Sequence, residues 1–236
     1  MGRRASTFVL GLALLLAGCN TAGRDFARPT ADSVVLGTTT RAEILQKYGP
    51  PARQSSLAGG LPGGSPPVQP APGPPRDPFD IVLAPGTYVS LTYAFAEKES
   101  PVFSFDVNRR SVTFIFWNDR LVAYSFASNF QQDSTDFDEA KISGIEKGKT
   151  TKGELRQLLG VPTGRAVYPF VQRPGEERLS YHYTITEMKT LQRRTKDLQV
   201  LFSADGWAMD YRFGSDVNPV PAPHGNPKIV DPPALF

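Results

Sequence analysis

The chain has 236 residues, with 26 Lys and Arg, 23 Asp and Glu, 2 His and 1 Cys, and a formal net charge of +3. A single cysteine excludes an internal disulfide, and two histidines leave little material for a histidine-rich metal or catalytic site. The nearly balanced charge, without a strong basic stripe, argues against nucleic acid as a partner.

The start of the chain has the pattern of a lipoprotein export signal. Arg3 and Arg4 precede the apolar run Phe8–Leu16, which is too short to span a bilayer. The run leads into the tetrapeptide LAGC, a lipobox that closes at Cys19. We therefore expect residues 1–18 to be a signal peptide and Cys19 to be the acylated first residue of the mature protein.

The residue after the lipobox cysteine bears on the destination of a lipoprotein. Asn20 stands where an Asp would resemble the signal for retention in the inner membrane, so we expect the outer membrane, with the body facing the periplasm. Residues 19–30 are expected to be a polar tether between the lipid and the body. Each buried acyl methylene contributes roughly 0.8 kcal/mol, so two or more chains on Cys19 make the membrane a stable partner.

Two short segments, displaced by 111 positions, repeat one another. Both Thr40–Glu43 and Thr151–Glu154 fit the capping box, in which Thr and Glu satisfy each other's backbone N–H groups. Gly49 and Gly160 follow where a left-handed residue ends a helix. Each motif therefore predicts a helix of about nine residues that must pack on another element.

The segments that follow predict antiparallel strands in both copies. Residues 89–95 align with 179–185 at an offset of 90, and residues 114–128 align with 201–215 at an offset of 87. Turn dipeptides interrupt the second pair and predict a hairpin in each copy. Residues 102–107 predict one further strand in the first copy. The turn dipeptides are Asn118-Asp119 and Asp205-Gly206.

These elements predict an α+β fold of two tandem repeats, each with short helices followed by an antiparallel sheet. Repeat 1 is expected at 31–130 and repeat 2 at 138–215. Residues 56–80, rich in Pro and Gly, are expected to be a disordered insert in repeat 1. Residues 216–236 are expected to be a Pro-rich tail.

The repeated pattern Gly-x-Thr-Thr-(Arg/Lys)-x-Glu, closed by Gly-x-Pro and followed by strands on a lipobox-bearing chain, resembles the SmpA/OmlA family of outer-membrane lipoproteins. That family includes the small lipoprotein subunit of the β-barrel assembly machinery, and its fold is similar to that of the tandem-repeat β-lactamase inhibitor proteins. The resemblance implies an envelope-associated binding module. This chain departs from the family in its second copy and its long insert.

Candidate chemistry is sparse. His182 lies in a predicted strand and is expected to be a surface or cross-strand side chain, and His224 lies in the tail. The acidic run Asp136–Glu139 lacks the glycine and glutamate of a calcium loop and fits a helix start better. Gly144–Lys149 does not match a phosphate-binding loop. The basic run Lys189–Lys196 is expected in a hairpin loop, as a solubilising segment or a contact for anionic headgroups or an acidic partner.

The sequence therefore predicts no catalytic, cofactor-binding or metal-binding residue, and one modified residue, Cys19. The expected function is that of a non-enzymatic lipoprotein that binds envelope proteins, with no nucleic acid and no small-molecule substrate evident. The alternative is a proteinaceous inhibitor of a secreted or periplasmic hydrolase.

Overall fold

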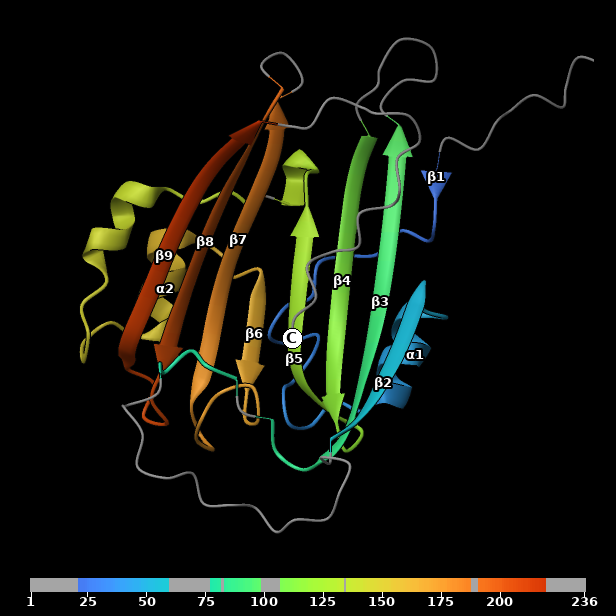
Figure 1. Cartoon of the computed structure of the whole chain (residues 1–236), viewed down its shortest axis with the longest axis horizontal. Helices are drawn as coiled ribbons and strands as arrows, with labels where there is room; N and C mark the ends of the chain where they lie inside the picture. Colours follow the sequence, from blue (N-terminus) through green and yellow to red (C-terminus); the bar gives the residue numbers. More distant parts are fainter. Residues whose placement is uncertain are drawn as a thin grey trace, which may run out of the picture.

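The computed structural model describes residues 21–59, 77–81, 83–98, 107–133, 135–187 and 191–219. In this part of the chain the strands form one antiparallel sheet in the order β1-β3-β4-β5-β6-β7-β8-β9, and β2 also pairs with β3 (Figure 1). The strands are β1 (Thr21–Ala22), β2 (Arg53–Gly59), β3 (Gly86–Lys98), β4 (Val107–Trp117), β5 (Arg120–Ser128), β6 (Gly164–Val167), β7 (Glu177–Glu187), β8 (Gln192–Phe202) and β9 (Ala208–Pro219). The helical elements are α1 (Arg41–Tyr48), η1 (Gln131–Asp133), η2 (Glu139–Gly144) and α2 (Lys152–Leu159).

The helices cover one face of the sheet, which gives the predicted α+β architecture. Figure 1 shows α1 behind β2 and β3, and α2 behind β8 and β9, so the opposite face is turned to the viewer. Among the described residues, no helix is long and apolar enough to cross a membrane.

Both predicted capping boxes are confirmed. The Thr40 hydroxyl accepts from Glu43 N at 3.2 Å, and Thr40 N donates to the Glu43 carboxylate at 2.7 Å. Thr151 and Glu154 make the same pair of bonds at 3.2 and 2.8 Å. Each helix ends at a glycine with a positive φ, 81° at Gly49 and 83° at Gly160, a conformation that other residues adopt at a cost.

The same helix-to-sheet contacts recur in the two repeats. The Tyr93 hydroxyl donates to the carbonyl of Gly49 at 3.0 Å, and the Tyr181 hydroxyl donates to the carbonyl of Gly160 at 3.2 Å. Thr40 forms an isolated bridge with Arg120, and Thr151 forms the equivalent bridge with Trp207. The two copies predicted from the sequence therefore share one internal geometry.

The strand alignment inferred from the sequence is wrong by a small shift. Because Tyr93 and Tyr181 make equivalent bonds, β3 corresponds to β7 at an offset of 88 (181 minus 93), not 90. Phe116, which pairs with Leu121, corresponds to Phe202, which pairs with Ala208, so β4 and β8 differ by 86 (202 minus 116). The tyrosine-rich strands and the longer turn between β8 and β9 concealed these shifts.

Each repeat buries its own helix-facing core. In repeat 1, Ile44 and Tyr48 of α1 pack on strand residues such as Leu91 and Phe114. In repeat 2, Leu155 and Leu159 of α2 pack on the residues Leu179, Tyr181, Leu198, Val200 and Phe202. These clusters fix which face of the sheet each alternate strand residue occupies.

The two repeats join at a short ladder. β5 pairs with β6 through three residue pairs, from Ala123↔Ala166 to Ser125↔Gly164. Arg28 reinforces this junction from the helix side, because its guanidinium donates to the carbonyls of Asp133 and Val161, both at 2.7 Å. The ladder makes the sheet continuous across the repeats, and Arg28 ties together the segments that flank it.

Three predicted boundaries need correction. The expected tether at 19–30 includes β1, and Arg28 packs on the body, with its guanidinium carbon 5.5 Å from the centroid of the Phe126 ring. The expected insert at 56–80 begins within β2, where residues 56–59 pair with β3. The expected tail at 216–236 begins within β9, which continues to Pro219. Pairing with a neighbouring strand, which local composition does not report, orders these segments. Residues 60–76, 102–106 and 220–236 lie outside the described part of the chain.

Candidate functional site

The face of the sheet that the helices leave uncovered is the candidate site, and we call it the open face. Its side chains alternate with the core positions along each strand, and the pairing aligns them in rows such as Thr92↔Thr113↔Ser125. Most of them are polar, many are Ser or Thr, and all are exposed or half-buried. The open face comprises Ser90, Thr92, Ala94, Arg109, Ser111, Thr113, Ser125, Ala127, Ser180, His182, Thr184, Thr195, Asp197, Gln199, Arg212, Gly214 and Asp216.

Loops cover the other end of the same face. Phe170 packs edge-on against Tyr88, with ring centroids 6.0 Å apart, and Phe79 packs with Val171 and Leu201. These apolar side chains occupy the end of the sheet where β3 and β7 begin. The open face is therefore limited to the half of the sheet toward the ends of β3 and β7.

Hydroxyl groups pair across the strands of repeat 1. Ser55 and Ser90 lie 2.7 Å apart through their Oγ atoms, and the Oγ1 atoms of Thr92 and Thr113 lie 3.1 Å apart. Each hydroxyl retains further donor or acceptor capacity. This region can therefore form hydrogen bonds with the surface of a partner without large rearrangement.

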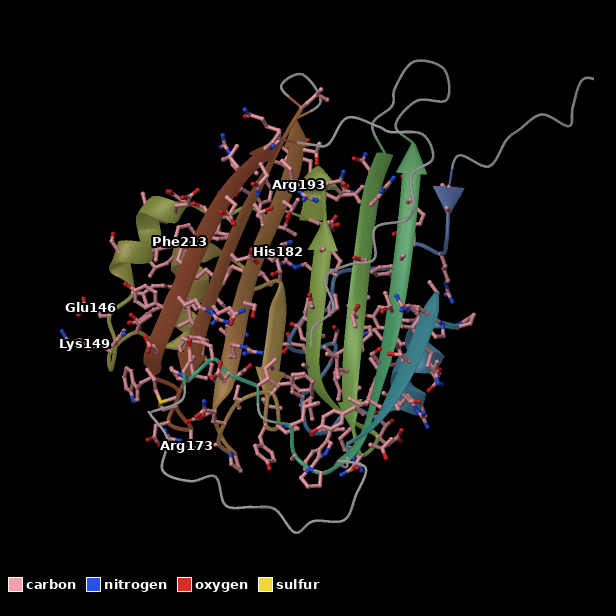
Figure 2. The ribbon with its side chains drawn as sticks, in the orientation of Figure 1. Glu146, Lys149, Arg173, His182, Arg193 and Phe213 are labelled. Carbon is pink, nitrogen blue, oxygen red and sulfur yellow. The ribbon has the colours of Figure 1, made fainter. Side chains whose placement is uncertain are left out.

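A longer network lies on the open face of repeat 2. His182 Nδ1 lies 2.6 Å from Asp197 Oδ1, and His182 Nε2 lies 3.1 Å from Thr184 Oγ1, which lies 3.4 Å from Thr195 Oγ1. As predicted, His182 is a cross-strand side chain. Figure 2 shows it on the uncovered side of β7.

The order Asp, His, Thr matches that of a hydrolytic triad, but its setting differs. Hydrolysis by such a triad requires a nucleophile in a water-excluding site with donors placed for an oxyanion. Here the His182 and Asp197 side chains are 40% and 55% exposed, and neighbouring positions on paired strands bring all four residues together. The arrangement fits a hydrogen-bonding surface better than a catalytic centre.

A buried carboxylate fixes α2 to the sheet. Glu177 accepts from Lys152 Nζ at 2.5 Å and from Arg165 Nε at 2.6 Å, and its side chain is 8% exposed. Burial alone would raise the pKa of the Glu177 carboxyl, but the bonds from Arg165 and Lys152 outweigh burial and hold the pKa below its ordinary value. This ion triad is structural, because the helix and the sheet surround it.

The acidic run Asp136–Glu139 is a helix start, as the sequence indicated. Asp138 caps η2 by accepting from Ala140 N at 3.0 Å. Asp136 forms an ion pair with the buried ammonium of Lys196, and Glu139 lies 3.8 Å from the same group. Across the described ranges, no group of three or more His, Cys, Asp or Glu could hold a metal ion.

The structure also shows where the basic run and the segment Gly144–Lys149 lie. Arg193, Arg194 and Lys196 lie on β8 rather than in a loop, which corrects the expectation for the basic run. Gly148 N donates to the carbonyl of Ala208, so it is not free to bind phosphate. Lys149 binds Glu146 at 2.8 Å, and this hydrogen bond raises the pKa of the lysine (Figure 2). Cys19 and His224 lie outside the described residues.

Comparison with known proteins gives one structural likeness. No family model and no curated protein matches the chain. The chain is similar to a Streptococcus mutans protein whose crystal structure is titled "putative beta-lactamase inhibitor protein", with 11% identity and a TM-score of 0.42, over 78% of this chain and 91% of that one. The SmpA/OmlA resemblance of the sequence therefore stays a hypothesis.

Proposed function

We propose that this protein is a non-enzymatic lipoprotein of the cell envelope, anchored through Cys19 in the outer membrane, which binds a protein partner on its open face. The observation that carries the proposal is the open face itself, a continuous sheet surface from β3 to β9 that the helices do not cover. A sheet in a stable domain usually buries at least one face and often leaves the other for solvent or a ligand.

The composition of the open face favours a protein over a small ligand. A small-molecule site is typically a concave, largely apolar pocket, whereas this surface is broad and carries Ser, Thr and a few charges. Asp197, His182 and Arg212 provide acceptor and donor groups on the repeat 2 side. Small hydroxyl side chains on the repeat 1 side let a partner approach the backbone closely.

Photo-crosslinking in intact envelopes tests the binding face. A photoreactive phenylalanine derivative at Thr113 or Thr184 should crosslink the same partner, because both positions lie on the open face. The same group at Gln157, exposed on α2, is the matched control and should give no such product. The proposal would be contradicted if the partner crosslinked at Gln157 and at neither Thr113 nor Thr184.

The anchor is tested separately. Cys19→Ser should abolish incorporation of a palmitate analogue and release the protein from the membrane fraction. Incorporation that survives the substitution would exclude lipidation at Cys19. If the crosslinked partner is instead a secreted or periplasmic hydrolase whose activity falls on binding, the protein is an inhibitor, the alternative function.

A further inference from the structure

Exposed apolar and basic residues cluster at one end of the sheet, beside the hairpin between β7 and β8. We call this cluster the hairpin tip, formed by Ile185, Leu191, Arg193, Arg194 and Val217. Ile185, Leu191 and Val217 are 38%, 48% and 55% exposed, although large aliphatic side chains are usually buried. The tip therefore exposes apolar area beside positive charge.

Strand pairing places three of the five tip residues on one face of the sheet. Ile185 pairs with Arg194, and Arg194 pairs with Val217, so the three side chains stand side by side on the helix face of the sheet. Arg193 projects from the opposite face, between Thr186 and Asn218. Figure 2 shows Arg193 nearer to this end of the sheet than His182.

The helical layer stops short of the tip. Phe137, which precedes η2, contacts Lys196 and lies edge-on to Phe213, with ring centroids 6.3 Å apart. Along β8 and β9, Arg194 and Val217 lie farther toward this end of the sheet than Lys196 and Phe213 do. The apolar side chains of the tip therefore face outward rather than into the core.

The positive charges of the tip are available for binding. Arg193 and Arg194 are exposed, and neither guanidinium forms an ion pair with any residue that the structure describes. Arg109, exposed near the same end of the sheet, adds a third such group. The acidic residues nearest these groups in the ladders are Glu97, Glu187 and Asp216.

The first described residue lies at the same end of the sheet. Thr21 pairs with Glu97, which pairs with Asn108. The hairpin between β7 and β8, with Ile185 paired to Arg194 and Arg194 to Val217, lies at this same end of the sheet, on the side opposite β1 (Figure 1). Cys19 precedes Thr21 by two residues, which span at most about 7 Å. A lipid on Cys19 would therefore hold this end of the sheet at the membrane surface.

We propose that the hairpin tip binds the anionic headgroup surface of the membrane, with Arg193 and Arg194 on phosphate groups and the apolar side chains at the acyl boundary. This inference rests on the proposed function, because the lipid on Cys19 sets how the protein is oriented at the membrane. Basic residues near an anionic leaflet and apolar side chains at its interface act together in this way. The open face would then stand roughly perpendicular to the membrane, accessible to a partner from the side.

Vesicle binding by the mature full chain with Cys19→Ser tests the proposal without the lipid anchor. The probes are vesicles of phosphatidylcholine with and without phosphatidylglycerol. The protein should co-sediment with the anionic vesicles, and added salt should weaken the binding. Arg193→Gln with Arg194→Gln should lower the partition coefficient about 30-fold, from the typical contribution of two basic residues.

Two further variants separate the tip from general charge. Lys141→Gln with Arg156→Gln removes two exposed cations from the helical layer and should leave binding unchanged. Leu191→Trp should show a blue shift in fluorescence only with anionic vesicles. Equal binding to neutral vesicles, or equal losses in both double variants, would overturn the proposal. It would also fail if the tip variant bound vesicles normally but lost an envelope protein. The vesicle assay uses protein without a lipid, so only the palmitate experiment would show that Cys19 is not lipidated.

Discussion

Arg110 and Lys196 occupy equivalent positions in the two repeats and hold opposite ends of the linker between them. Arg110 Nε lies 3.2 Å from Asp133 Oδ2, and its guanidinium carbon lies 4.3 Å from the centroid of the Phe130 ring. Lys196 forms an ion pair with Asp136, and its Nζ donates to the carbonyl of Phe137 at 2.7 Å. Each repeat therefore buries one cation to fix its side of the linker.

The two cations should differ in their contribution to stability. Arg110→Met leaves Asp133, whose side chain is 9% exposed, as a buried carboxylate without this partner, so unfolding free energy should fall by about 3 to 5 kcal/mol. Lys196→Met leaves Asp136 and Glu139, which are 54% and 45% exposed and stay solvated, so its loss should be smaller. Chemical denaturation measures both, with Lys149→Met as a surface control. Equal losses would contradict this account.

The capping boxes should contribute equally and to one transition. Thr40→Ala and Thr151→Ala each remove an N-cap acceptor, which should cost about 1 kcal/mol. Because both helices pack on one continuous sheet, each substitution should lower a single melting transition measured by calorimetry. Thr40→Ser and Thr151→Ser retain the hydroxyl and should restore most of the loss. Two transitions, each sensitive to one substitution, would indicate independent domains.

Acid should destabilise the protein through Glu177. Its folded pKa is held below the ordinary value of 4.5, so the ionised carboxylate stabilises the fold above about that pH. The contribution declines as the pH falls through the folded pKa. Glu177→Gln should lower stability at neutral pH and make it less dependent on pH in the acidic range. Glu146→Gln, at an exposed pair, is the control. An unchanged acid profile in Glu177→Gln would exclude this role.

The segment after the Pro/Gly-rich stretch should be part of the core. Phe79 is 5% exposed, and its carbonyl accepts from Arg178 Nη1 at 3.3 Å. Phe79→Ala should therefore destabilise the protein by about 3 to 5 kcal/mol. Ile81→Ala, at a side chain that is 38% exposed, should have a much smaller effect. A wild-type melting curve for Phe79→Ala would place this segment outside the folded body.

The local elements could be predicted from the sequence because their signals are local. The capping boxes, the terminal glycines and the Asn118-Asp119 turn, with φ of 48° and 66°, depend on residues within a few positions of each other. Strand register could not be predicted in the same way. Tyr181 and Tyr183 are both tyrosines, and only the contact with Gly160 shows which of them corresponds to Tyr93.

The candidate site was harder to predict because it depends on which face of each strand the helices cover. Thr113 and Thr184 have no chemical signal of their own that would mark them as residues of a site. The basic run was recognised, but its placement in a loop was wrong, since a turn shorter than expected puts Arg193 and Arg194 in β8. The placement of Thr21 at the same end of the sheet as the tip depends on the order and direction of strands across the whole sheet.

The short ladder between β5 and β6 also has a mechanical consequence. Three residue pairs join the halves there, whereas β3 and β4 pair along eleven. The line of lowest stiffness in the sheet therefore runs through its centre, and changes in curvature concentrate on that line. Arg28 spans the same line from behind and limits how far it opens. A partner that contacts both repeats would thus meet a surface that bends at its middle while each half keeps its shape.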